Sequence, residues 1–201
     1  MQRVILNHHT PLVICSNAIR TCWQSQDKSD NGGEKDQELI ERVGNKFKHS
    51  STLEHLVYNF TIHCSRAVLQ EWSRHRVASL SVKSTRYTLK ELKDELPFEI
   101  TRDDRERAKK YVVFTDELCV NNSIMKALEE LRLVLQQGIS NDKAKYCLPE
   151  AYKTEINWSI NARSLQNFLA LRTSRSALWE IREIAFEVFN ALPNDHKYLF
   201  K

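Results

Sequence analysis

The chain has 201 residues, of which 41% are hydrophobic and 28% are charged, and its formal net charge is +4 at pH 7. This balance is typical of a soluble globular protein, and the length predicts a single domain over residues 1–201 with a substantial core. No apolar run approaches the roughly 18 residues that a membrane-spanning helix needs, so we expect no contact with a membrane.

The cysteines, histidines and glycines lack the spacings of common metal and nucleotide motifs. The five cysteines include no CxxC pair, and the seven histidines include no HExxH. We therefore expect no bound metal, and the odd number of cysteines without CxxC spacing favours a reducing, cytoplasmic location. With four glycines and neither a GxGxxG nor a Walker A pattern, any nucleotide phosphate would have to be held largely by side-chain donors.

Hydrophobic periodicity predicts alternating short elements in the first half of the chain. In order, these are a strand or strand-to-helix entry at 3–6 and 12–15, a loop at 27–35, an amphipathic helix at 38–47, a strand at 57–64 and a helix at 65–73. On the residues alone, Ser51 or Thr52 is best explained as the cap of a short helix ahead of the 57–64 strand.

The segment 74–87 concentrates positive charge where the preceding helix ends. Three arginines, a histidine, a lysine and several hydroxyl side chains lie within it, without glycine or proline. A guanidinium is a planar donor fork suited to phosphates and to pyrimidine carbonyls, and it stays charged. The segment therefore suits an anion pocket, while a solvated basic surface is the alternative on composition alone. Residues 80–84 alternate in the manner of extended chain.

The second half is predicted to hold long helices and one clear strand. The elements are two helices or one bent helix over 106–138 ending at Gly138, a strand at 154–160, a helix at 162–172 and a last helix at 176–191. Asn161 is suited to cap the 162–172 helix.

Two features of the 162–172 helix suggest a binding role. Arg172 continues an apolar stripe, where a guanidinium is costly unless an anion or carbonyl meets it; a buried ion pair with a glutamate is the alternative. Arg163 and Asn167 are four residues apart and could grip one ligand together.

The segment 74–87 resembles the signature of the flavin-dependent thymidylate synthases. That pattern is Arg-His-Arg, two residues, Ser, one residue, Asn-Glu, one residue, Ser, one residue, Arg-Tyr. The chain matches it at Arg74, His75, Arg76, Ser79, Ser84, Arg86 and Tyr87, and departs from it at Ser81 and Val82, where Asn and Glu are usual. Three further patches, at 49–55, 144–149 and 161–172, resemble the family in the same order, with Lys145 where arginine is usual.

The resemblance implies an α+β fold in which helices flank an antiparallel sheet, assembled as a homotetramer whose subunits share active sites. It implies reductive methylation of dUMP to dTMP. Methylenetetrahydrofolate would give the carbon and leave as tetrahydrofolate, and NADPH would reduce a bound FAD that supplies the hydride. The implied partners are dUMP, NADPH and the folate, with no nucleic acid.

The resemblance also assigns residues to this chemistry. Arg172 would stabilise negative charge at the N3/O4 edge of the uracil, and Ser84 would act there as a positioning donor. The residues it places on the flavin are His49, Ser51, Arg74, His75, Arg76, Val82, Asn161, Arg163 and Asn167. The residues it places on dUMP are Glu71, Arg74, Val82, Lys83, Ser84, Thr85, Arg86, Lys145 and Arg172, with Glu71 standing where glutamine is frequent.

Two other functions are compatible with the same residues. A nucleic-acid-binding protein would use the basic segment on phosphates, with affinity that falls steeply with salt. An oxidoreductase that binds flavin without methyl transfer is the other alternative, which the departure at Val82 keeps open.

Overall fold

The computed structural model describes residues 3–200 and divides them into two compact units. The first unit comprises residues 3–62, 73–81 and 156–200, and the second comprises 63–72 and 82–155. Each unit is considered by itself below, and the single domain expected over 1–201 stays a prediction.

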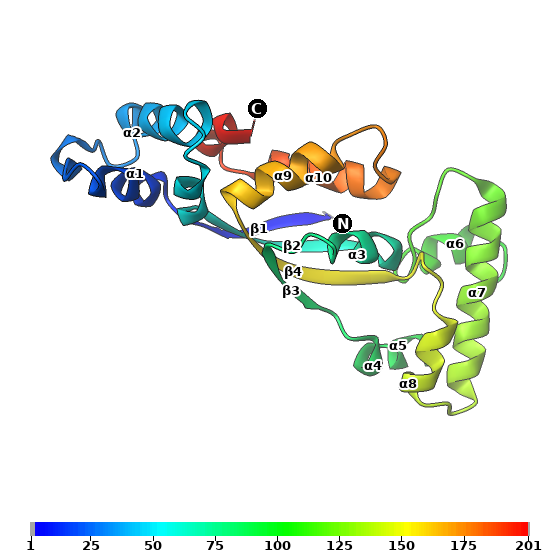
Figure 1. Cartoon of the computed structure of the whole chain (residues 1–201). Coiled ribbons are helices and arrows are strands. Elements are labelled where there is room, and N and C mark those ends of the chain that lie inside the picture. Colours follow the sequence, from blue (N-terminus) through cyan, green and yellow to red (C-terminus); the bar gives the residue numbers. More distant parts are fainter. Residues whose placement is uncertain (1–2, 201) are drawn as a thin grey trace. The chain divides into compact units, whose positions relative to one another are not determined.

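A four-stranded sheet carries the order β1-β2-β4-β3 (Figure 1). Its strands are β1 (Val4–His9), β2 (Val57–Ser65), β3 (Ala78–Val82) and β4 (Lys153–Asn161). β1 runs antiparallel to β2 with a register shift between Leu6 and His8. Every second residue of β2 and β4 is buried, as the alternation predicted, and the predicted α+β class with an antiparallel sheet is confirmed.

The first unit adds several helices to its part of the sheet. They are α1 (Leu12–Thr21), α2 (Glu34–Ile40), α9 (Ala162–Arg172) and α10 (Trp179–Ala191), with 3-10 turns at Gln26–Lys28, Ser50–His55 and Asn194–Phe200. α9 and α10 lie side by side, and α10 packs on β1 (Figure 1). The predicted helices at 162–172 and 176–191 are confirmed, although α10 begins only at Trp179.

The second unit is mainly helical. Its helices are α3 (Arg66–Trp72), α4 (Thr85–Thr88), α5 (Lys90–Lys93), α6 (Arg102–Ala108), α7 (Leu118–Gln136) and α8 (Asn141–Ala144), followed by a 3-10 turn at Lys145–Cys147. Leu128, Leu131 and Leu135 of α7 are buried in its core. Of the two alternatives predicted for 106–138, the one with two helices is correct, and these are α6 and α7. Gly138 follows α7 with a φ of 78°, a conformation that favours glycine.

Two details around residues 34–55 differ from the sequence predictions. The helix predicted at 38–47 begins at Glu34, because Asp30 accepts hydrogen bonds from the backbone of Lys35 and Asp36, and it continues as a π-helix over Glu41–Lys46. The cap expected from Ser51 or Thr52 is wrong, since the 3-10 turn has no side-chain cap and the Thr52 hydroxyl donates to the His49 carbonyl at 2.8 Å.

A buried histidine ties the last turn of the first unit to β2. His196 is 1% exposed, its Nδ1 lies 2.8 Å from the Tyr58 hydroxyl, and its ring meets that of His9 edge-on at 5.0 Å. Burial lowers the pKa of His196 to about 4, with Asp195 opposing the shift and His9 adding to it. The fold therefore holds this imidazole neutral.

We expect acid to destabilise the protein through His196. The unfolded chain binds this proton near the ordinary pKa of 6.5, so the stabilisation is complete above that value. It is lost as the pH falls towards about 4, by roughly 3 kcal/mol. Urea unfolding across this range should show a shallower pH dependence for His196→Asn than for the wild type. The exposed His8→Asn serves as control, and an unchanged slope in His196→Asn would contradict the assignment.

Candidate functional site

A cavity of about 720 Å³ in the first unit is lined by charged and polar side chains from three segments. These are the 3-10 turn Ser50–His55, the stretch that leads into β3, and α9. The lining residues are Glu54, Arg74, His75, Arg76, Val77, Arg163, Ser164, Asn167, Leu171 and Arg172. Four arginines against one carboxylate give this wall a positive charge suited to an anionic ligand.

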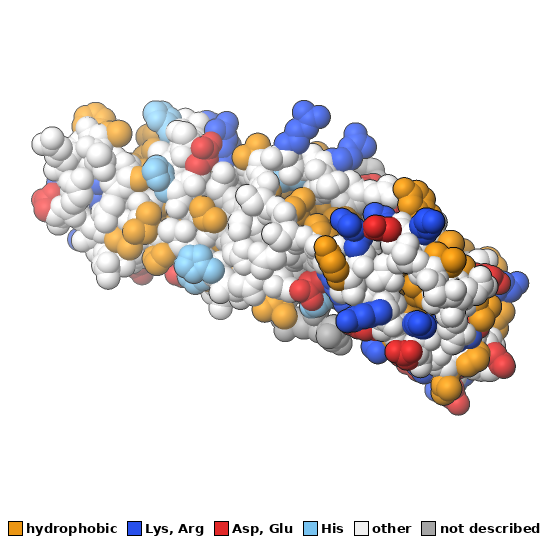
Figure 2. Space-filling model, turned by 90° about the horizontal axis from the view of Figure 1, so that it is seen from below, with side chains coloured by type: hydrophobic (Ala, Val, Ile, Leu, Met, Phe, Trp, Pro, Cys, Tyr) orange, Lys and Arg blue, Asp and Glu red, His pale blue; other side chains and the backbone are white. Residues whose placement is uncertain are grey.

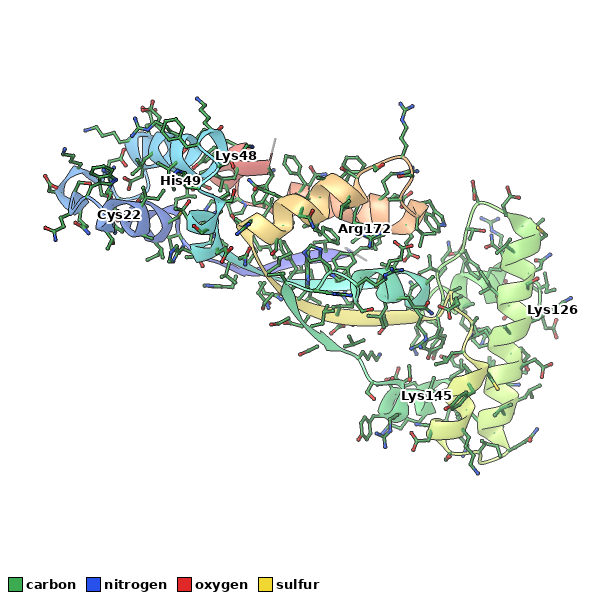
Figure 3. All side chains as sticks on the ribbon, in the orientation of Figure 1. Cys22, Lys48, His49, Lys126, Lys145 and Arg172 are labelled. Atoms are coloured by element: carbon green, nitrogen blue, oxygen red, sulfur yellow. The ribbon has the colours of Figure 1, made fainter. Side chains whose placement is uncertain are left out.

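The cap and the buried face of helix α9 determine which of its residues face the cavity. The Asn161 side chain caps the helix by accepting from the Ser164 backbone N–H at 2.9 Å, as predicted. Leu165 and Phe168 are fully buried on the opposite side and hold the helix against the core. Arg163 and Asn167 therefore face the cavity one turn apart. Half-buried Arg172 is the last residue of the helix (Figure 3).

His75 stands in the cavity wall beside two aromatic rings. Its ring meets those of Trp158 and Phe168 edge-on at 6.5 and 5.7 Å. Burial lowers the pKa of His75, the positive charge of Arg172 lowers it further, and a hydrogen bond with the Ser164 backbone opposes both. Its Nε2 is buried without a hydrogen-bond partner among residues 3–200, so a polar group of a ligand would satisfy it.

One ion pair lies at the edge of this cavity. Arg163 Nη1 donates to Glu54 Oε1 at 2.7 Å, joining α9 to the 3-10 turn across 109 residues of sequence. Both side chains are about half exposed, at 55% and 47%. Arg74 and Arg76 are exposed, so these arginines stay accessible from solvent.

A second set of predicted residues lies in the second unit, where Arg86 meets the region of Lys145. Arg86 Nε lies 2.7 Å from Asp142 Oδ1, and the Arg86 carbonyl accepts from Asn141 Nδ2 at 2.8 Å. Asn141 and Asp142 open α8, which Lys145 follows directly (Figure 3). Arg86 of the signature is therefore held against the helix that leads into the third patch.

The neighbouring residues of that unit have distinct environments. Ser84 is half buried and precedes α4, whereas Thr85 is buried. Val82 is 40% exposed, and the Lys83 backbone N–H donates to the Glu155 carbonyl at 2.8 Å. Glu71 lies on α3 and is half buried.

Comparison with known proteins decides the family. A family model described as "Thymidylate synthase complementing protein" matches residues 3–194. A flavin-dependent thymidylate synthase of Wolinella succinogenes is 66% identical over 198 residues, covering 98% of this chain and 96% of the relative, and that of Helicobacter pylori is 59% identical over 201 residues, covering 98% and 97%. The chain belongs to the flavin-dependent thymidylate synthase family.

A solved structure of that family carries the same fold. The flavin-dependent thymidylate synthase of Helicobacter pylori, complexed with FAD and dUMP, superimposes with a TM-score of 0.95 at 58% identity, covering 99% of this chain and 98% of that one. The resemblance read from the signature is thus confirmed, and the protein is an enzyme of the flavin-dependent thymidylate synthase class.

Against the family's pattern, some predicted residues do not line the cavity. His49 and Ser51 are exposed on or beside the 3-10 turn (Figure 3 labels His49), and Asn161 engages its side chain in the helix cap. Sequence reasoning missed Glu54 as a cavity residue. A usable signal existed, because Glu54 is the only acid in the patch 49–55 that resembles the family.

A larger cavity of about 910 Å³ also borders α9 but holds none of the predicted site residues. It is lined by lysines, amides and aromatic rings, including Lys48 and Phe186. We take the smaller cavity as the candidate site of the first unit, because Arg74, His75, Arg76 and Arg172 all line it.

The cysteines and acidic groups offer little for covalent or metal chemistry. Cys15 and Cys64 are buried, and burial raises the pKa of Cys15 to about 12. Cys22, Cys119 and Cys147 are exposed, and none of the five lines the arginine cavity. Within residues 3–200, no three side chains of the metal-binding types come together, and no helix is long and apolar enough to cross a membrane.

Proposed function

We propose that this protein converts dUMP to dTMP by reductive methylation. Methylenetetrahydrofolate donates the carbon and leaves as tetrahydrofolate, and NADPH is the reductant through bound FAD. The observation that carries the proposal is the cavity lined by four arginines and His75, in a chain 58% identical to an enzyme solved with FAD and dUMP.

The residues of the cavity suit FAD. A diphosphate is matched by guanidinium forks, and Arg74, Arg76 and Arg163 provide them. Asn167 and the unsatisfied Nε2 of His75 add neutral polar contacts. When bound, the flavin would supply hydride chemistry at this wall. The remaining flavin contacts that we propose are His49, Ser51, Val82 and Asn161.

The residues of the second unit suit the nucleotide phosphate. Arg86 and Lys145 are the cations we propose for it, with Glu71, Val82, Lys83 and Thr85 around the nucleotide. Lys145 keeps a charge but lacks the bidentate fork of an arginine. Arg86 is held by Asp142, and a dianionic phosphate would compete for that guanidinium.

Two residues are proposed to act on the uracil ring itself. Arg172 stabilises negative charge at the N3/O4 edge, because a fixed guanidinium in a half-buried wall interacts strongly with developing charge. Arg74 also contacts the nucleotide, and the half-buried Ser84 hydroxyl positions the ring rather than attacking it. We propose no thiolate attack on the ring, and none of the five cysteines lines the arginine cavity.

We further propose a cytoplasmic homotetramer whose subunits share active sites. This would allow residues of the two sets to meet across copies of the chain. A nucleic-acid-binding role is less well supported, because on the face shown in Figure 2 the lysine and arginine side chains are interleaved with acidic ones rather than forming an unbroken basic stripe.

The purified protein is expected to be yellow, to release FAD on denaturation and to oxidise NADPH in a dUMP- and folate-dependent manner with formation of dTMP. Absorbance spectra and chromatography of the products measure these outcomes. Flavin-dependent NADPH oxidation without dTMP would favour the oxidoreductase alternative, which the presence of Val82 in place of glutamate suggests. A colourless protein with no affinity for FAD would exclude both functions.

A further inference from the structure

The carboxylate of Glu54 is the single acidic group among the residues that line the arginine cavity. Its Oε1 accepts from Arg163 Nη1 at 2.7 Å. The other arginines of the wall come from the stretch before β3 and from the end of α9. Glu54 therefore engages one particular arginine, at the first turn of α9, and leaves the guanidinium's remaining N–H groups for other acceptors.

This ion pair adds little to the stability of the fold, but it can affect the affinity for a ligand. Its two side chains are 55% and 47% exposed, and ion pairs so open to water contribute little to the folded state. An arginine side chain has many rotamers, and fixing one of them before a ligand arrives removes an entropic cost from binding. The main effect of the Glu54 carboxylate is therefore to preorganise the Arg163 side chain for binding.

We propose that Glu54 is a positioning residue that holds Arg163 at the cavity wall and thereby raises the affinity for the anionic part of FAD. The inference rests on the proposed function, since it takes FAD as the ligand of this cavity. Glu54 acts through Arg163 and need not touch the flavin. The added negative charge works against anion binding, but at half exposure it is screened by water and salt.

A double-mutant cycle tests the proposal. The apoproteins of the wild type, Glu54→Ala, Arg163→Ala and the double variant are titrated with FAD, following quenching of flavin fluorescence. Glu54→Ala is expected to raise the Kd by about tenfold, the scale of one restricted arginine side chain. In the Arg163→Ala background the same substitution should change the Kd by less than about twofold, because its target is gone.

Conservative variants and a matched control separate positioning from general structure. Glu54→Gln keeps an oxygen acceptor for Arg163 and should recover part of the affinity. Glu183→Ala removes the acid of another ion pair in the first unit, in which Arg3 Nη1 lies 3.0 Å from Glu183 Oε2. The Glu183 side chain is 51% exposed, and neither residue lines the cavity. It should leave the Kd for FAD unchanged, and the thermal midpoints of both apoprotein variants should equal that of the wild type.

Three results would overturn the inference. These are a Kd for Glu54→Ala within twofold of the wild type, tighter binding by that variant, or equal weakening in the presence and absence of Arg163. If the wild-type apoprotein binds no FAD, the proposed function fails together with the inference. If it binds FAD and the cycle shows no coupling, the inference alone fails.

Discussion

Arg172→Ala will lower the rate of dTMP formation by about a thousandfold while the protein retains FAD, because loss of one preorganised donor at a developing oxyanion costs about this much. Arg172 ends α9 and lines the cavity with His75, whose pKa it lowers by its charge. Other cavity arginines remain to hold the flavin, so the defect should fall on the chemical step. Single-turnover production of dTMP and the flavin content of the purified variant measure the two effects separately.

Two comparisons sharpen this prediction. Arg172→Lys keeps the charge but loses the planar fork, and we expect it to recover only a small part of the rate. The pKa of His75 should rise in Arg172→Ala because a neighbouring positive charge is removed, and NMR titration of the imidazole reports this change. Full dTMP production by the alanine variant would refute the role of Arg172 whatever the flavin content.

The amino-acid pattern predicts the elements of the site better than their contacts. Alternation gave β2 and β4, and the cap at Asn161 marked the start of α9, since both signals depend on near neighbours in sequence. The placement of Arg172 and His75 in one wall followed only from family resemblance. The pairing of Glu54 with Arg163 could not be predicted, because it joins side chains 109 residues apart through an irregular 3-10 turn.

The contacts of the polar segment 27–35, which matter for stability, could not be predicted from the sequence either. The sequence shows a charged segment that contains two glycines, and its pattern does not predict that any side chain there contacts a buried group. In the structure it wraps a carboxylate, because Ser29 and the backbone of Gly32 both donate to Asp36. The loop residues are thus polar for a structural reason, since they donate hydrogen bonds to the buried carboxylate of Asp36 on α2.

Asp36→Asn is therefore expected to reduce the free energy of unfolding by about 3–5 kcal/mol, the usual cost of removing one partner of a buried ion pair. The Asp36 side chain is 0% exposed, and its Oδ1 accepts from Arg20 Nη2 at 2.7 Å. Its Oδ2 accepts from Ser29 Oγ at 2.6 Å and from the Gly32 N–H at 2.9 Å. An amide keeps the shape but loses the charge, so Arg20 stays buried without its counter-ion. Urea unfolding measures the loss, with the exposed Glu34→Gln of the same helix as control.

The pH dependence of the wild type gives an independent check on Asp36. Burial alone would raise the pKa of this carboxyl, but hydrogen bonds from Ser29, Arg20 and the Gly32 backbone lower it to about 2. A lowered pKa means that the unfolded chain takes up the proton first, near 3.8, so the stabilisation is complete above that pH and is lost as the pH falls towards about 2. The wild type should lose this contribution in that interval, whereas Asp36→Asn, which has no proton to bind there, should not. Equal losses in the two proteins would mean that the buried carboxylate is not the group on which the α1–α2 region depends.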